Sequence, residues 1–258
     1  MKKVDHWSTD VFLSSPIIRQ LKNSTKYFQN YKVWPTIQQY QNIFSEYSLD
    51  VKPVAQAQEI NSFEELYESR VFLKKELQTR TENWHDFFNA QVWMNFPETK
   101  RILNKLHYSE SINRPKGSNR STLENRITQF DECGAILIST DKEILNLIKQ
   151  HKWTTLFINH REQLQDNFRC VVFGHAIFEK AISPYIGITC HCLLVEDQSL
   201  LAQAKIDDFS GIDDYLCTKW EKEIVYNPLK FDAFPLLGLP GYWHNQNIEF
   251  YLNKKYFR

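Results

Sequence analysis

Apolar residues recur at helical spacing in neighbouring segments near the middle of the chain. Asn83 can cap the first of these, which runs from Trp84 to Asn95. Pro97 ends that segment and suits the first turn of a second one, which continues to His107. A third amphipathic segment follows over residues 142–151. The pattern therefore predicts at least three helices with one buried face each.

Other segments favour strands or more buried helices. Residues 126–139 have the pattern of a β-hairpin whose turn is Asp131–Gly134, and residues 188–195 alternate well enough for a further strand. The segment 167–183 is apolar nearly all round and predicts a central helix, while 200–222 predicts a helix with one interruption. We therefore expect an α+β fold, mainly helical, with a small antiparallel sheet.

The first 60 residues differ from the rest of the chain. Residues 1–60 are polar and aromatic, lack a strong period, and are interrupted by Pro35 and Pro53. Because disordered segments avoid aromatic residues, we expect an N-terminal arm packed on the core. Residues 61–258 would then form a single α+β domain.

Composition narrows the function classes. The 258 residues carry 31 Lys+Arg and 31 Asp+Glu, which gives no electrostatic attraction for nucleic acid or an anionic membrane. Seven scattered glycines, the first at Gly117, provide no dinucleotide-binding, P-loop or nucleophile-elbow motif. Five cysteines without a C-x-x-C pair favour free thiols. Since no apolar run fits a signal peptide or a membrane span, we expect a cytoplasmic protein.

Polar residues occupy regular positions on the two helices predicted around Pro97. His85 and Asn89 are separated by one helical turn, so they share a face of the first helix. Lys100, Asn104 and His107 form a polar stripe on the second helix. This stripe is either a solvated helix face or the wall of a binding site.

His175 and Glu179 are also one turn apart, inside the strongly apolar segment 167–183. A buried polar group without a partner costs about 1–3 kcal/mol, so both side chains need partners. The pair is either a structural hydrogen bond or part of a functional site.

Three chemical uses fit these residues. Two histidines with Glu179 or Asp86 can hold a divalent metal ion and leave a position for water. A histidine oriented by a carboxylate can act in general acid–base catalysis. Lys100 and Asn104 can donate hydrogen bonds to an anionic group of a ligand.

Several segments carry a resemblance to a known family, namely Asn83–Ala90, Phe96–Lys100, Thr128–Gly134, Phe173–Ala176 and Leu237–Trp243. Together they resemble a proteobacterial family of uncharacterised proteins, domain of unknown function three-zero-two-five, and the resemblance covers about Glu65 to Arg258. The resemblance implies a bacterial, cytoplasmic, single-domain protein and brings no established activity. In two places the chain departs from the family pattern, with Cys133 in place of an expected asparagine and Asn125 in place of an expected aspartate. The residues that match its polar motif positions are His85, Asp86, Asn89, Lys100, His107, Asp131, Glu132 and His175.

Two hypotheses follow. The first is a hydrolase or related transfer enzyme that acts on a small polar or anionic metabolite. In it, His85 or His175 acts as base or metal ligand, Glu179 or Asp86 as orienting carboxylate or ligand, and Lys100 as anion contact. The second is a non-catalytic module that binds a ligand or a protein partner, in which the polar residues form structural networks. The sequence leaves open the substrate, the presence of a metal and the oligomeric state.

Overall fold

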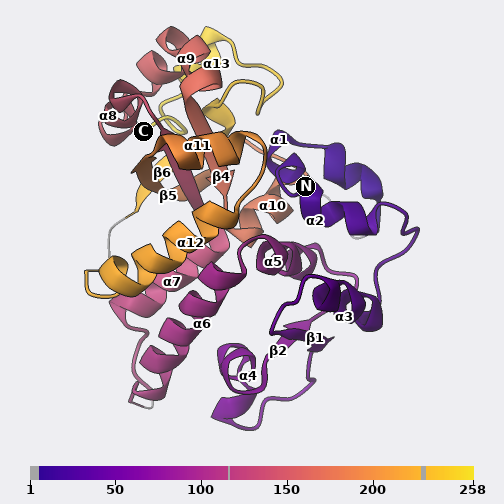
Figure 1. The fold of residues 1–258 in the computed structure, drawn as a ribbon. Coiled ribbons are helices and arrows are strands. Elements are labelled where there is room, and N and C mark those ends of the chain that lie inside the picture. The colour runs from indigo at the N-terminus through magenta and orange to yellow at the C-terminus, as the bar shows by residue number, and fades with distance from the viewer. Residues whose placement is uncertain (1–5, 116, 228–230) are drawn as a thin grey trace.

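The computed structural model describes residues 6–115, 117–227 and 231–258, and it alternates many helices with a few short strands (Figure 1). In chain order the helices and strands are α1 (Pro16–Arg19), α2 (Lys22–Thr25), α3 (Ile37–Glu46), β1 (Lys52–Ala55), α4 (Tyr67–Lys74), β2 (Glu76–Thr79), α5 (Trp84–Asn95), α6 (Pro97–Ile112), α7 (Thr122–Cys133), β3 (Gly134–Ser139), α8 (Lys142–Lys149), α9 (Arg161–Asn167), β4 (Phe168–Val172), α10 (His175–Ala181), β5 (Thr189–Glu196), α11 (Gln198–Lys205), α12 (Ser210–Lys219), β6 (Asp232–Pro235) and α13 (Ile248–Tyr251). The predicted α+β class, with more helix than strand, is confirmed.

The larger sheet has the strand order β4-β3-β5-β6. Strand β3 is buried along its whole length, pairs antiparallel with β4 and runs parallel to β5. Helix α11 packs against β3 and β4, whereas α7 and α8 pack against β3 and β5. The sheet is therefore mixed. The predicted antiparallel pairing holds for β3 with β4 and for β5 with β6, and it is wrong for β3 with β5.

The predicted hairpin at 126–139 is also wrong. Its first half belongs to helix α7, which Ser121 and Glu124 begin with a reciprocal capping box. Leu123, Ile127 and Phe130 recur at helical spacing and are buried, so this segment packs as a helix. Only the second half is a strand, β3, and the predicted strand at 188–195 is confirmed as β5.

The apolar segment 167–183 divides into two elements. Residues 168–172 form strand β4, and helix α10 begins at His175. A strand buried on both faces reads as a continuous apolar run, which is why its pattern resembles that of a buried helix. His175 and Glu179 still share one helix, with the histidine at its first residue.

The described part of the N-terminal region, residues 6–60, packs on the helices that follow it. Strand β1 pairs in parallel with β2 to form a second, two-stranded sheet. Trp7 stacks on Trp84 of α5, with ring centroids 5.2 Å apart and planes at 8°. Phe28 is fully buried and contacts Phe87 edge-on at 5.1 Å. These aromatic contacts cover α5, so that α5 lies inside the molecule (Figure 1).

The end of α7 and the start of α10 meet at Gly174. Phe173 and Gly174 both donate backbone hydrogen bonds to the Gly134 carbonyl, at 3.0 and 2.9 Å. A Cβ atom at position 174 would lie 2.5 Å from the backbone of Cys133 and from the Glu132 carbonyl oxygen. Only glycine fits this approach, which sets His175 beside the last turn of α7.

We expect Gly174→Ala to lower the free energy of unfolding by about 1–3 kcal/mol, because the new methyl group meets backbone atoms that cannot move aside. Gly117→Ala is the comparison, since Gly117 has a φ of +80° and no neighbour within 4 Å. That change isolates backbone strain, about 1 kcal/mol. Denaturant unfolding measures both, and a Gly174 variant no less stable than the Gly117 variant would contradict the steric argument.

Candidate functional site

Helices α5, α6, α7 and α10 and the start of α4 line one cavity of about 580 Å³. Asn83 caps α5 by accepting a hydrogen bond from the Asp86 amide, which fixes the first turn and with it His85. Gly174 places His175 at the first residue of α10. Both histidines line this cavity, together with Asn89, Lys100, Asn104, His107, Asp131 and Glu132.

The two histidines face each other across the helix interface. His85 Nε2 lies 3.0 Å from His175 Nε2, and the rings are edge to face with centroids 4.4 Å apart. The His175 side chain is only 5% exposed, whereas that of His85 is 28% exposed. Burial lowers the pKa of His175 to about 3, although Asp131 opposes this effect, so the ring is neutral near pH 7.

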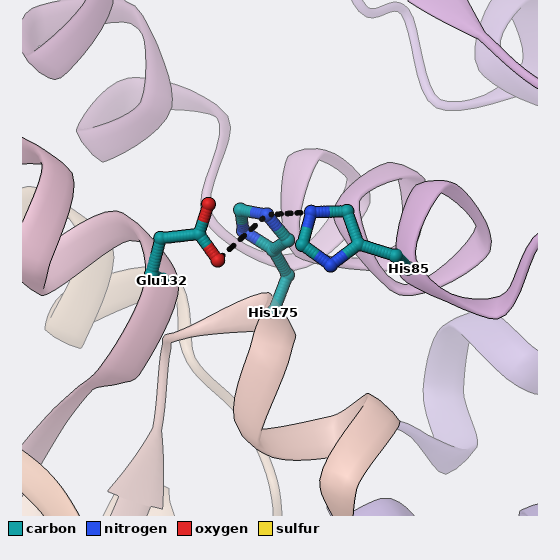
Figure 2. Close-up of side chains that lie close together, drawn as sticks. All are labelled: His85, Glu132 and His175. Carbon is teal, nitrogen blue, oxygen red and sulfur yellow. Dashed lines mark hydrogen bonds and ion pairs between the residues drawn. The ribbon is translucent and has the colours of Figure 1, made fainter. Parts of the chain in front are cut away.

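Glu132, from the last turn of α7, points its carboxylate at this pair (Figure 2). Its Oε2 atom lies 3.7 Å from His175 Nε2. One ligand atom from each of His85, Glu132 and His175 lies within 4.8 Å of the other two. Burial raises the pKa of the Glu132 carboxyl. Two imidazoles and a carboxylate thus meet at one point, which is a donor set that divalent metal ions use.

Two further carboxylates, those of Glu179 and Asp131, lie on the outer sides of the two imidazole rings. Glu179 Oε2 is 3.0 Å from His85 Nδ1, and this hydrogen bond raises the pKa of His85. Asp131 Oδ2 is 3.8 Å from His175 Nδ1. Each imidazole therefore has a carboxylate beside Nδ1 and directs Nε2 toward the other ring. The structure pairs Glu179 with a histidine of another helix, a partner that the spacing within α10 does not indicate.

Lys100 belongs to a buried network beside this cluster. Its ammonium lies 2.6 Å from Asp131 Oδ1, donates to Asn89 Oδ1 at 3.0 Å, and lies 5.5 Å from the centre of the Trp93 ring. Asn89 donates in turn to the Tyr67 hydroxyl at 2.7 Å. Burial raises the pKa of Asp131, but Lys100 and His175 outweigh it, so that the net pKa is lowered. The charge of Lys100 is already compensated inside the protein.

The rest of the polar stripe on α6 continues along the same cavity. Asn104 donates to the Glu68 carboxylate at 2.6 Å and to the Glu68 carbonyl at 2.9 Å. His107 Nδ1 and Ser69 Oγ are buried and have no hydrogen-bond partner within the described ranges. Lys100, Asn104 and His107 are 4%, 7% and 8% exposed, so this stripe is not a solvated helix face.

Asp86 lines the cavity without joining the histidine cluster. Its two carboxylate oxygens accept hydrogen bonds from the Arg80 guanidinium at 2.8 and 3.0 Å, and one also accepts from the Arg80 amide at 2.7 Å. Its carboxylate is thus engaged in a bidentate ion pair. The carboxylate that contacts His85 is Glu179.

Asp131 and Glu132 are the site residues that the sequence pattern assigned to another role, a hairpin turn. The capping box at Ser121 and Glu124 was the signal that could have placed them correctly. A helix that begins there and keeps its apolar spacing through Phe130 carries both acids in its last turn.

These features define an α+β protein with a polar pocket between four helices and an inner cluster of histidines and carboxylates. The chain belongs to the family described as "Protein of unknown function (DUF3025)", whose model matches residues 51–258, and the predicted resemblance is confirmed. No curated protein and no solved structure gives a significant match. Within the described ranges, no helix combines the length and apolar character needed to cross a membrane.

We expect Lys100→Met to lower the free energy of unfolding by about 3–5 kcal/mol, because Asp131 is left as a buried charge without its ammonium partner. Combining it with Asp131→Asn removes that charge, so the double variant should be more stable than Lys100→Met alone. Lys105→Met is the control, since the ion pair of Lys105 with Glu221 is exposed and 3.8 Å long. Denaturant unfolding tests the cycle, and strictly additive losses would contradict it.

Proposed function

We propose that this protein is a hydrolase or a related transfer enzyme that acts on a small polar metabolite. The observation that carries the proposal is the convergence of His85, His175 and Glu132 on one point inside a cavity. Their side chains come from three helices that are far apart in the sequence. A cluster of this kind activates water, either by accepting its proton or by holding a metal ion that binds it.

The carboxylates of Glu179 and Asp131, on the outer sides of the two histidines, support a reactive centre. Glu179 holds His85 through Nδ1 and directs Nε2 toward the centre of the cluster. This is the orienting role that a carboxylate has toward a catalytic imidazole. Asp131 stands in the corresponding place beside His175 and is fixed by Lys100. The acidic role that we proposed for either Glu179 or Asp86 therefore goes to Glu179.

The cavity suits a small polar substrate. Its volume of about 580 Å³ lies within the range of small-molecule sites, about 300–1,000 Å³. Asn89, Lys100, Asn104 and His107 form the wall that would bind the substrate in this proposal. His107 Nδ1, together with Ser69 Oγ, offers a hydrogen-bonding atom that no described residue of the protein uses. Because Asp131 compensates Lys100, a polar substrate fits this wall better than a strongly anionic one.

The location that fits the proposal is the cytoplasm. All five cysteines are free, and three of them, Cys170, Cys190 and Cys192, are buried. A hydrogen bond with Cys170 and burial raise the pKa of the Cys190 thiol, and burial raises that of the Cys192 thiol, so these act as packing residues rather than nucleophiles.

A panel of chromogenic esters, phosphoesters and amides tests the proposal. We expect the wild-type protein to turn over at least one class of these probes, and His85→Ala and His175→Ala to lower that rate at least about 100-fold. The control is His244→Ala, because His244 is exposed, packs against Trp243 with its ring tilted by 42°, and does not line the cavity.

Turnover that survives both histidine changes would assign the reaction to a contaminant or another site. A folded wild-type protein that turns over no probe class would favour the second hypothesis, a non-catalytic module that binds a ligand or a protein partner. In that case the Lys100–Asp131–Asn89 network would serve to fix the helix packing.

A further inference from the structure

We propose that His85 Nε2, His175 Nε2 and Glu132 Oε2 bind one divalent transition-metal ion of the zinc type. The inference deepens the proposed function, on which the catalytic role of the ion rests. The binding of the ion itself rests on the geometry of the described residues. It can therefore be tested without knowing the substrate.

The hydrogen bond with Glu179 determines which ring nitrogen of His85 carries a proton. Glu179 Oε2 lies 3.0 Å from Nδ1, and an ionised carboxylate can only accept a hydrogen bond. Nδ1 of His85 must therefore carry a proton. In the neutral imidazole the other nitrogen, Nε2, then has a lone pair that points into the cluster.

His175 is under a similar constraint. Asp131 Oδ2 faces its Nδ1 at 3.8 Å, and Lys100 holds Asp131 in the ionised form. A proton on Nδ1 of His175 is attracted to this carboxylate. If the proton were on Nε2 instead, a nitrogen lone pair would face the Asp131 carboxylate, which is repulsive. The favoured tautomer therefore again leaves a lone pair on Nε2.

The two lone pairs then meet without a proton between them. The two Nε2 atoms are 3.0 Å apart, and the Glu132 carboxylate adds further negative charge 3.7 Å from His175 Nε2. Three electron-rich atoms at this separation repel one another unless a cation lies among them. The carboxylates of Glu179 and Asp131, beside the Nδ1 atoms of His85 and His175, add to this demand for positive charge, although Lys100 compensates Asp131 in part.

The distances fit a metal ion. Bonds of about 2.0–2.1 Å in a tetrahedral site place two ligand atoms about 3.3 Å apart. Two of the three separations, 3.0 and 3.7 Å, lie on either side of this value. The third, between His85 Nε2 and the Glu132 carboxylate, lies within 4.8 Å, so a rotation of the Glu132 side chain toward His85 completes the site. Glu179 occupies the place of an outer partner that orients a metal-bound histidine, through its hydrogen bond with His85 Nδ1. Asp131 faces His175 Nδ1 at 3.8 Å, and among the described residues this nitrogen has no hydrogen-bond partner. Three protein ligands leave the fourth position for water, and the cavity gives access to it.

The competing occupant is a proton. If His85 is an imidazolium ion, it donates to Glu179 and to His175 Nε2, and this also satisfies the cluster. The two occupants differ in what they require of Glu132. A metal ion uses the Glu132 carboxylate as a ligand, whereas the shared proton lies between two nitrogens and does not need it. Changes at Glu132 therefore separate the two cases.

The experiment uses the full chain, purified without a histidine tag and treated with a chelator. We titrate it with Co²⁺, followed by its visible absorption bands, and with Zn²⁺, followed by calorimetry. We expect one ion per chain and Co²⁺ bands of the intensity typical of four-coordinate sites. Circular dichroism before and after chelation checks that the protein remains folded.

Two variants keep the shape of the side chains and change their charge. Glu132→Gln should weaken Zn²⁺ binding at least about 100-fold, because it removes a charged ligand. Glu179→Gln keeps a hydrogen-bond acceptor for His85 and should weaken binding about 10-fold, as changes to outer partners do. The Glu132 side chain is 40% exposed, so its variant is expected to fold. Glu223→Gln and His244→Ala are the matched surface controls and should bind as the wild type does.

Folded wild-type protein that binds neither ion would overturn the metal site, and so would binding that Glu132→Gln leaves unchanged. Probe turnover tests the proposed function separately from the metal site. Probe turnover that persists in metal-free protein would show that the reaction does not need the metal ion. The protein would then be a hydrolase that uses its histidines directly. Stoichiometric metal binding without turnover of any probe would support the metal site and contradict the proposed hydrolase activity.

Discussion

The backbone contact between the end of α7 and the start of α10 is the constraint on which the site depends. The Gly134 carbonyl accepts two hydrogen bonds, from Phe173 and from Gly174, where strand β4 turns into α10. The pairing of Ala135 with Val172 fixes the same register one residue further into the sheet. Glu132 and His175 are therefore held together by main-chain geometry rather than by their own contact. A site on such rigid elements is already arranged before any ligand binds.

Charge balance around this contact is uneven. Asp131, Glu132 and Glu179 bring three carboxyl groups to the two imidazoles. Lys100 pairs with Asp131, and the Lys180 ammonium lies 3.5 Å from Cys133 Sγ, next to Glu132. Burial raises the pKa of the Glu132 carboxyl, which disfavours its charged form. The protein nevertheless keeps these three acids close to two imidazoles. A cation at the centre of the cluster would lower the electrostatic free energy of this arrangement.

The sequence predicted the parts of the site that depend on local spacing. The caps and apolar periods around Pro97 gave α5 and the start of α6, and a helical period placed Lys100, Asn104 and His107 on one face of α6. The period left open whether that face is solvated, and the structure shows that it is buried. Local spacing could not give the partners across helices. Glu179 bonds His85, which is 94 positions away, and the parallel pairing of β3 with β5 leaves no local pattern.

The hairpin error has a physical cause of the same kind. Two acids followed by Cys133 and Gly134 have the composition of a turn, and glycine is the residue that a turn favours. Here Gly134 instead follows the last residue of α7 and begins β3. A Cβ at this position would lie 2.3 Å from the Phe130 carbonyl oxygen, so this close backbone approach requires glycine. The same residue type serves a turn or a close backbone approach, and only the tertiary contacts distinguish the two uses.

Hydrogen bonding divides the cavity into two regions of different character. Near α7, Lys100, Asp131 and Asn89 satisfy one another, and such a network holds its members rigidly. Further along α6, His107 Nδ1 and Ser69 Oγ are buried without a partner among the described residues. Each unsatisfied group costs about 1–3 kcal/mol in the folded protein. A ligand that bonds to them would relieve that cost. His107 lies seven positions after Lys100, so such a ligand would have to extend about 10 Å along the helix from Lys100. The satisfied region is thus suited to positioning reactive groups, and the unsatisfied region to recognising a ligand.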